Sequence, residues 1–245
     1  MTEKIIILDF GSQYTQLIAR AVREANVFCE ILPYHKKISP DPFLKGVILS
    51  GSPFSVNEKD APEVDILALQ RQLPVLGICY GAQLTAKQYG GQVARSNKRE
   101  YGRALLRKKQ EDILLKDVID LSQVWMSHSD SVLEMPAGFE VLATTDDIPF
   151  AAFKKNGEAF PIYGVQFHPE VYHSIEGKKV LKNFLVNICG CKQDWTPAHF
   201  ITDTVNALKQ QIGNRKVVMA LSGGVDSTVA ATLIHRAIGD KLSGI

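Results

Sequence analysis

The first 80 residues alternate between short apolar runs and amphipathic segments. The apolar runs cover residues 4–10, 27–32, 46–49 and 74–78, and they have the length of strands that are buried on both faces. The amphipathic segments have apolar residues at helical spacing and cover residues 13–25, 63–73 and 81–89. Strands that alternate with helices predict right-handed crossovers and a mainly parallel central sheet flanked by helices.

A different pattern follows between residues 92 and 168, where short strands dominate. We expect them at residues 103–107, 123–126, 139–143, 151–154 and 162–167, which predicts a mixed or antiparallel extension of the sheet. An amphipathic helix over residues 177–189 then closes a first α/β domain, residues 1–190, and Gly190 is expected to end that helix.

Residues 191–245 are predicted to form a linker helix and the beginning of a second α/β domain. Thr196 and Pro197 are a typical N-cap and first helical residue, and the predicted helix runs to about residue 212. An apolar strand over 217–221 leads into a glycine-rich loop, and a helix is expected from about Ser227. Too few residues follow this loop to complete a domain, so we expect the chain to be part of a longer protein.

Composition narrows the classes of function. The 28 Lys and Arg residues nearly balance the 26 Asp and Glu residues, which predicts no binding to nucleic acid or to an anionic membrane. We see neither a signal peptide nor an apolar run of the ~20 residues that a membrane helix needs. The four cysteines do not form a disulfide framework. Cys189 and Cys191 could suggest a metal site, but no second Cys/His pair has zinc spacing. A reduced, cytoplasmic protein without a metal site is expected.

Cys79 has the surroundings of a nucleophile. It stands between the apolar run 74–78 and the helix expected from Gly81, so the positive end of a helix dipole faces its sulfur and favours a thiolate. Gly77 and Gly81 flank it at the spacing of a nucleophile elbow, a sharp strand-to-helix turn. The alternative is a buried core cysteine with incidental glycines.

A candidate base follows a later strand. His168 lies at the end of the run 162–167, and Glu170 is placed to orient its imidazole, as a nucleophilic thiol requires. The turn at 49–53 and the backbone N–H of Tyr80 are a candidate oxyanion hole. The alternative for the turn is an ordinary connection between strand and helix.

Four segments together resemble the class I, or triad, glutamine amidotransferases: residues 9–14 (DFGSQY), 49–53 (LSGSP), 77–83 (GICYGAQ) and 165–170 (VQFHPE). The resemblance implies that Cys79 attacks the glutamine amide, His168 is the acid and base, and Glu170 orients it, without a cofactor for this step. It also implies oxyanion donors at the backbone of Ser52 and Tyr80 and glutamine contacts at Gln83, Ser127, His128, Ser129 and Asp130. Ser52 and Ser129 stand where many members have Gly, which would strain the backbone only if φ were positive there.

The glycine-rich loop resembles the PP-loop of the ATP pyrophosphatases. It lacks the Lys of a Walker A loop, but its N–H groups and the following helix can bind an anion; the loop residues are Ser222, Gly223, Gly224, Val225, Asp226 and Ser227. The resemblance implies ATP and Mg²⁺, which Asp226 would help to position. The alternative role of Asp226 is the N-cap of the helix.

The fusion of these two parts resembles the GMP synthetase family. It implies that the chain releases ammonia from glutamine, that a longer protein uses ATP to adenylate XMP and transfers the ammonia to it, and that this protein is a homodimer. Two alternatives remain open. One is an amidotransferase of anthranilate, aminodeoxychorismate or carbamoyl phosphate synthesis, and the other is a regulatory module with an idle triad.

Overall fold

The computed structural model describes residues 2–156 and 159–245, and the side chains of these residues outside 96–100. The described chain divides into two compact units between Asp194 and Trp195. The domain boundary expected after residue 190 stays a prediction.

The first unit is built on one sheet of nine strands among the described residues. Five parallel strands lie side by side and are followed by four antiparallel strands, which confirms the predicted α/β fold with its mixed extension. In spatial order they are β2 (Phe28–Pro33), β1 (Lys4–Asp9), β3 (Leu44–Leu49), β4 (Val75–Ile78), β9 (Ile162–Val165), β8 (Ala152–Lys155), β7 (Glu140–Thr144), β5 (Gln92–Lys108) and β6 (Ser122–Glu134).

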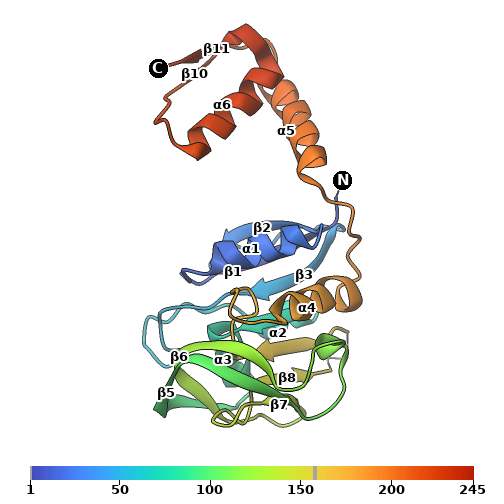
Figure 1. Cartoon of the computed structure of the whole chain (residues 1–245). Helices are drawn as coiled ribbons and strands as arrows, with labels where there is room; N and C mark the ends of the chain where they lie inside the picture. The colour runs from blue at the N-terminus through green and yellow to red at the C-terminus, as the bar shows by residue number, and fades with distance from the viewer. Residues whose placement is uncertain (1, 157–158) are drawn as a thin grey trace. The chain divides into compact units, whose positions relative to one another are not determined.

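Two apolar clusters cover the two faces of the parallel strands. In β1, Ile5 and Ile7 belong to one cluster and Ile6 and Leu8 to the other, because successive side chains of a strand point to opposite faces. Helices α1 (Thr15–Glu24) and α4 (Gly177–Lys182) contribute to the first cluster, and α2 (Ile66–Gln70) and α3 (Tyr80–Gln88) to the second. Figure 1 shows the helices on both sides of these strands. The uninterrupted apolar runs of the sequence follow from this double burial.

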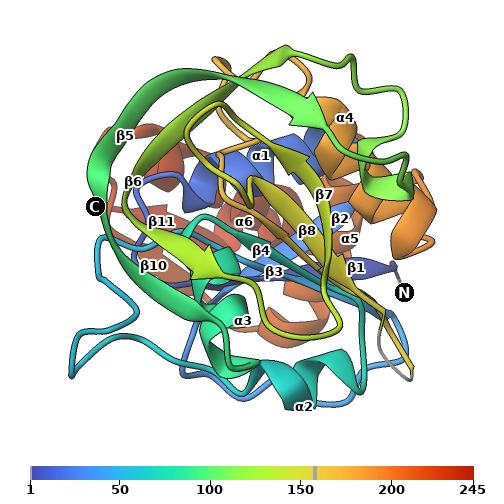
Figure 2. The ribbon, with the colours of Figure 1, turned by 90° about the horizontal axis from the view of Figure 1, so that it is seen from below.

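The antiparallel part is larger than the sequence indicates. The strands expected at 103–107 and 123–126 are segments of β5 and β6, which pair antiparallel as a long hairpin. Figure 2 shows this hairpin as a long curved ribbon. Buried and partly exposed residues alternate along much of β6, as in a strand with one solvated face, so polar residues hide its length in the sequence.

Two predicted helices differ from those observed. The helix expected over 63–73 is only α2, which starts after Asp65, whose carboxylate caps it by accepting the N–H of Ala68 at 2.9 Å. The helix expected over 177–189 is α4 continued by a π-helical segment, Asn183–Ile188. There the Asn183 amide donates to the carbonyls of Leu114 and Lys116 beside the short 3-10 turn Ile113–Leu115, a tertiary contact that a helical periodicity does not encode.

The second unit contains α5 (Pro197–Ile212), β10 (Val217–Met219), α6 (Val225–Ile238), a 3-10 turn (Gly239–Lys241) and β11 (Leu242–Gly244). The predicted cap of α5 is confirmed, because the Thr196 hydroxyl accepts the N–H of His199 at 3.2 Å. Helix α6 begins earlier than expected, at Val225 with Gly224 as N-cap, so the N-cap role for Asp226 is wrong. No helix within residues 2–156 and 159–245 is long and apolar enough to cross a bilayer.

Candidate active site

Cys79 lies on a strained turn between β4 and α3. Its backbone has φ 52° and ψ −103°, a left-handed conformation that non-glycine residues adopt at a cost of about 1–3 kcal/mol. The flanking glycines make the turn possible: a Cβ on Gly77 would lie 2.5 Å from the backbone of Gly81, and a Cβ on Gly81 would lie 2.6 Å from Leu49 Cβ. The geometry is that of the elbow predicted from the spacing.

The sulfur of Cys79 is buried at the N-terminus of α3. Only 5% of the residue is exposed, and Sγ lies 3.9 Å from the carbonyl oxygen of Ser127. Tyr80 is the first residue of α3, so its N–H belongs to the helix N–H groups that have no intrahelical acceptor. Such a donor next to a nucleophile can stabilise an oxyanion.

His168 and Glu170 form a buried pair. Nδ1 of His168 lies 2.7 Å from Oε1 of Glu170, and the imidazole has an edge-to-face contact with the Tyr14 ring, with centroids 4.9 Å apart. Burial by itself lowers the pKa of His168, but the Glu170 carboxylate and the Cys79 thiol outweigh it, so the pKa lies well above its ordinary value. The imidazole is therefore held in one orientation and readily keeps a proton.

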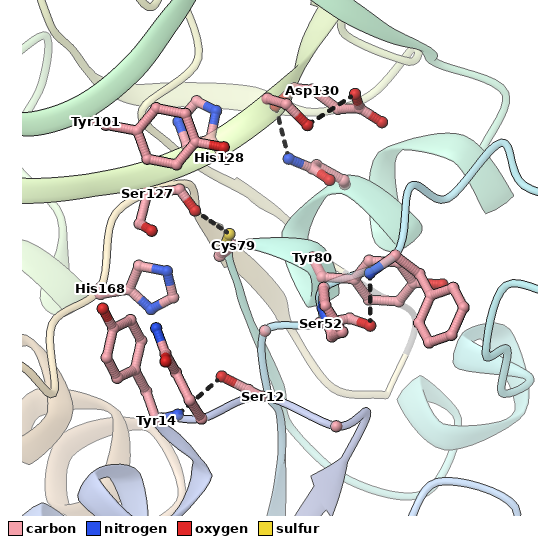
Figure 3. Close-up of a pocket in the computed structure, with 17 residues that line it drawn as sticks. Ser12, Tyr14, Ser52, Cys79, Tyr80, Tyr101, Ser127, His128, Asp130 and His168 are labelled. Atoms are coloured by element: carbon pink, nitrogen blue, oxygen red, sulfur yellow. Dashed lines mark hydrogen bonds between the residues drawn. The ribbon is translucent and has the colours of Figure 1, made fainter.

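Cys79, Tyr80 and His168 line one cavity of about 350 Å³, shown in Figure 3. It lies beyond the carboxyl ends of β1, β3 and β4, the edge where parallel α/β sheets place their ligands. All the residues predicted to bind glutamine line it, together with Cys79, His168 and both candidate oxyanion residues; the predicted set is Ser52, Tyr80, Gln83, Ser127, His128, Ser129 and Asp130. Glu170 does not line the cavity and contacts His168 instead.

The far wall of the cavity is held by hydrogen bonds around Asp130. Its carboxylate accepts the hydroxyl of Ser55, from the loop after β3, and the hydroxyl of Ser129 at 3.4 Å. Its carbonyl accepts the Gln83 amide at 2.7 Å. One aspartate therefore links β6, α3 and the loop that carries Ser52.

His128 is buried beside this wall without a hydrogen-bond partner among the described residues for either ring nitrogen. Burial and, less strongly, nearby His168 together lower its pKa to about 4 against the opposing effect of Asp130. The imidazole is therefore neutral at pH 7.

The two departures from the commoner family pattern cause no backbone strain. Neither Ser52 nor Ser129 is among the non-glycine residues with positive φ. A serine at these positions thus presents its N–H as a glycine would.

Several residues of this cavity have no role that the sequence alone indicates. Tyr14, at the N-cap of α1, contacts His168, and its N–H donates to the Ser12 hydroxyl at 3.0 Å. Both residues lie in the segment 9–14, which contributes to the family resemblance but indicates no function for either of them. Tyr101, an exposed residue of the long strand β5, also lines the cavity. It stands next to Gly102, which has φ 125°, and nothing else in the sequence around it indicates a functional role.

In the second unit, the loop between β10 and α6 is open. Gly223 has φ 77°, and a Cβ added to it or to Gly224 would meet no neighbouring atom closer than 3.4 Å. The Ser222 and Ser227 hydroxyls lie 3.1 Å apart across the loop. Exposed N–H groups at the N-terminus of α6 fit a phosphate. Over the described residues, no group of three His, Cys, Asp or Glu side chains converges to hold a metal ion.

Comparison with known proteins assigns the chain to a family. The model of the class I glutamine amidotransferases matches residues 6–188, and that of NAD synthase matches residues 198–245. The GMP synthases (glutamine-hydrolyzing) of Cytophaga hutchinsonii and Bacteroides thetaiotaomicron are 57% and 55% identical to the chain over its whole length, which is 48% of theirs. The chain thus spans about half the length of the curated relatives it matches.

Solved structures agree with this assignment. The crystal structure of a putative GMP synthase subunit from Thermoplasma acidophilum has 27% identity and a TM-score of 0.64, covering 78% of this chain and 95% of its own. A glutamine amidotransferase from Thermotoga maritima, 20% identical with a TM-score of 0.62, shares the fold. The first unit and the family model coincide over most of the chain, which therefore belongs to the class I glutamine amidotransferases.

Proposed function

We propose that the chain hydrolyses glutamine to glutamate and ammonia through Cys79, His168 and Glu170. The observation that carries this proposal is the strained elbow that presents Cys79 in the same cavity as the Glu170-oriented imidazole of His168. A thiol on such a turn with an oriented base is the arrangement of a nucleophilic acyl-transfer enzyme.

The steps follow from the positions of these groups. The thiol proton resides on His168, where the Glu170 carboxylate stabilises it, and the resulting thiolate attacks the side-chain carbonyl of glutamine. The backbone N–H groups of Ser52 and Tyr80 stabilise the oxyanion. His168 returns the proton to the departing nitrogen, which leaves as ammonia, and a thioester to Cys79 remains. Water, deprotonated by His168, attacks the thioester, the C–S bond breaks to release glutamate, and the Cys79 thiolate and the protonated His168 are restored.

Contacts around the cavity support the binding of glutamine. Gln83 and the segment 127–130 line the cavity together with Ser52, and Asp130 brings a negative charge to it. Such a charge attracts the α-ammonium group of the substrate.

We infer further that the chain is the amidotransferase part, residues 1–190, of a GMP synthase, followed in 191–245 by a linker helix and the first part of an ATP pyrophosphatase domain. Identities of 53–57% to curated GMP synthases over nearly the whole chain support this. The whole enzyme would convert XMP, ATP, glutamine and water to GMP, AMP, pyrophosphate and glutamate. The loop Ser222–Ser227 would bind the ATP phosphates, Mg²⁺ would neutralise their charge beside Asp226, and the whole enzyme would be a homodimer.

The test of the glutaminase is the release of glutamate from glutamine by the purified chain. We expect turnover by the wild-type chain and by Cys189→Ala, and none by Cys79→Ala. Turnover by Cys79→Ala would contradict the proposal. The nucleotide acceptor is tested separately, by the ATP-dependent amination of XMP in the protein extended to the length of the relatives.

A further inference from the structure

His168 lies beyond the end of β9, so its backbone is not held by the regular sheet. β9 ends at Val165, three residues earlier. The N–H of His168 instead donates to the carbonyl of Trp125 in β6 at 3.0 Å. The position of the imidazole therefore depends on how this short stretch is fastened to β6.

A second link between His168 and β6 passes through a side chain. The hydroxyl of Ser174 donates to the carbonyl of His168 at 2.6 Å and accepts the N–H of Trp125 at 3.0 Å. His168 and Trp125 are thus joined by one direct hydrogen bond and by one that runs through the Ser174 oxygen. The inserted hydroxyl sets the distance between the two backbones.

Ser174 is itself held in place. It is 4% exposed, its N–H donates to Val171, and its carbonyl accepts the N–H of Gly177, each at 3.0 Å. The neighbouring segment is tied to the same strand, since the Gln123 amide donates to the carbonyl of His173 at 2.8 Å. A water molecule cannot readily replace a hydroxyl that is this closely surrounded.

From these contacts we propose that Ser174 is a positioning residue for the triad, which acts by fixing the backbone of His168 on β6. The proposal rests on the glutaminase function proposed above. Without the hydroxyl, the carbonyl of His168 and the N–H of Trp125 lose their partner, and they either stay unpaired or approach each other directly. The first outcome removes a restraint on the position of the imidazole and the second moves it relative to Cys79, and a displacement of ~1 Å in an active site can reduce the rate about 10²-fold.

The test compares Ser174→Ala, Ser174→Thr, which keeps the hydroxyl, and Ser131→Ala as the matched control. Ser131 is also a buried serine of the first unit, but its hydroxyl has no partner among the described residues. We expect Ser174→Ala to reduce kcat for glutamate release about 10–100-fold with KM changed less than about threefold, because the hydroxyl does not touch the substrate. Ser174→Thr and Ser131→Ala should keep near-normal kcat.

Two further measurements separate positioning from simple destabilisation and from a wrong function. Urea unfolding should show that Ser174→Ala remains folded under assay conditions, and the imidazole proton between His168 Nδ1 and Glu170 should shift in its NMR spectrum but not in that of Ser131→Ala. An unchanged kcat and an unchanged imidazole signal in Ser174→Ala, or a loss of kcat explained by unfolding alone, would overturn the proposal. If the wild-type chain released no glutamate, the proposed function would fall, and the imidazole signal would still decide the role of Ser174.

Discussion

Two strand-to-helix turns with glycines, at Cys79 and at Ser222–Ser227, are packed in opposite ways. At Cys79 the turn is buried and strained, and the missing Cβ atoms of Gly77 and Gly81 allow backbone segments to touch. At Ser222–Ser227 the turn is exposed, and open space surrounds its glycines. The first turn has the rigidity that a covalent nucleophile needs, and the second has the accessible N–H groups that a phosphate needs.

The units around the two turns differ in the same sense. Large apolar residues of the first unit form two buried clusters on the faces of its sheet. In the second unit, α5 and α6 contain no buried residue, and Val225 and Val229 are 78% and 52% exposed. Glycines of the first turn are therefore required by packing, whereas in the second turn only Gly223 is required, by its backbone φ of 77°.

Loss of the nucleophile is the strongest test of the first turn. Cys79→Ala should reduce glutamate release by about 10⁶-fold, the loss that removal of a triad nucleophile causes. A glutamine-like electrophile such as 6-diazo-5-oxonorleucine should label Cys79 alone, as checked by mass spectrometry. Burial raises the pKa of Cys29 to about 11 and that of Cys191 to about 12, so these thiols are protonated at pH 7. A label mainly on another cysteine would contradict the assignment.

Loss of Glu170 should reduce glutamine turnover less than loss of His168. We expect His168→Ala to abolish turnover, whereas Glu170→Gln should retain a measurable fraction, because an imidazole without its orienting group keeps part of its capacity. The pKa of His168, followed by NMR titration, should fall in Glu170→Gln, because the carboxylate holds it above its ordinary value. Near-normal turnover by His168→Ala would remove the triad from the mechanism.

The part of this site that the sequence predicts consists of residues that are close together along the chain. Gly77, Cys79 and Gly81 lie within five residues, and His168 and Glu170 are two residues apart, so spacing alone placed them on turns after strands. The apolar runs that place those turns on one edge of the sheet are local as well. The roles assigned to these residues stay predictions until the activity is measured.

Other parts of the site depend on contacts between distant residues. Ser174 meets Trp125 across 49 residues of sequence, and Ser55 meets Asp130 across 75. Neither residue type is unusual at its position, so nothing in the local pattern marks the contact. The sequence does not predict the full length of β5 and β6 for a related reason, since polar residues outnumber apolar ones in both strands.

Adding one methyl group to each turn tests the packing difference directly. Gly77→Ala would place Cβ 2.5 Å from backbone atoms of Gly81, which cannot move independently of α3. We expect it to lower the free energy of unfolding of the first unit by about 3 kcal/mol, at the upper end of overpacking effects. In Gly224→Ala the added Cβ would contact only the Ser222 hydroxyl, at 3.4 Å, so the free energy of unfolding measured in urea should not change. Equal effects would contradict the comparison.

The smallest expected effect concerns His128, which is buried in the first unit with a pKa lowered to about 4. In the unfolded chain a histidine has a pKa of about 6.5, so below that pH the unfolded state binds a proton that the folded state does not, and stability falls as the pH falls toward 4. Between pH 6.5 and 4.5 this amounts to about 2 kcal/mol, at about 1.4 kcal/mol per pKa unit. His168 adds little slope in this range, because its pKa is raised and it is mostly protonated in both states.

Unfolding of the first unit, followed by Trp125 fluorescence in a Trp195→Phe background, measures this directly. His128→Gln should lose less stability than the wild-type chain between pH 6.5 and 4.5. His35→Gln, which removes an exposed histidine of the same unit, should follow the wild-type curve. If His128→Gln and the wild-type chain lost the same stability on acidification, His128 would be protonated in the folded state. The buried wall of the cavity would then be as open to solvent as the loop of the second unit.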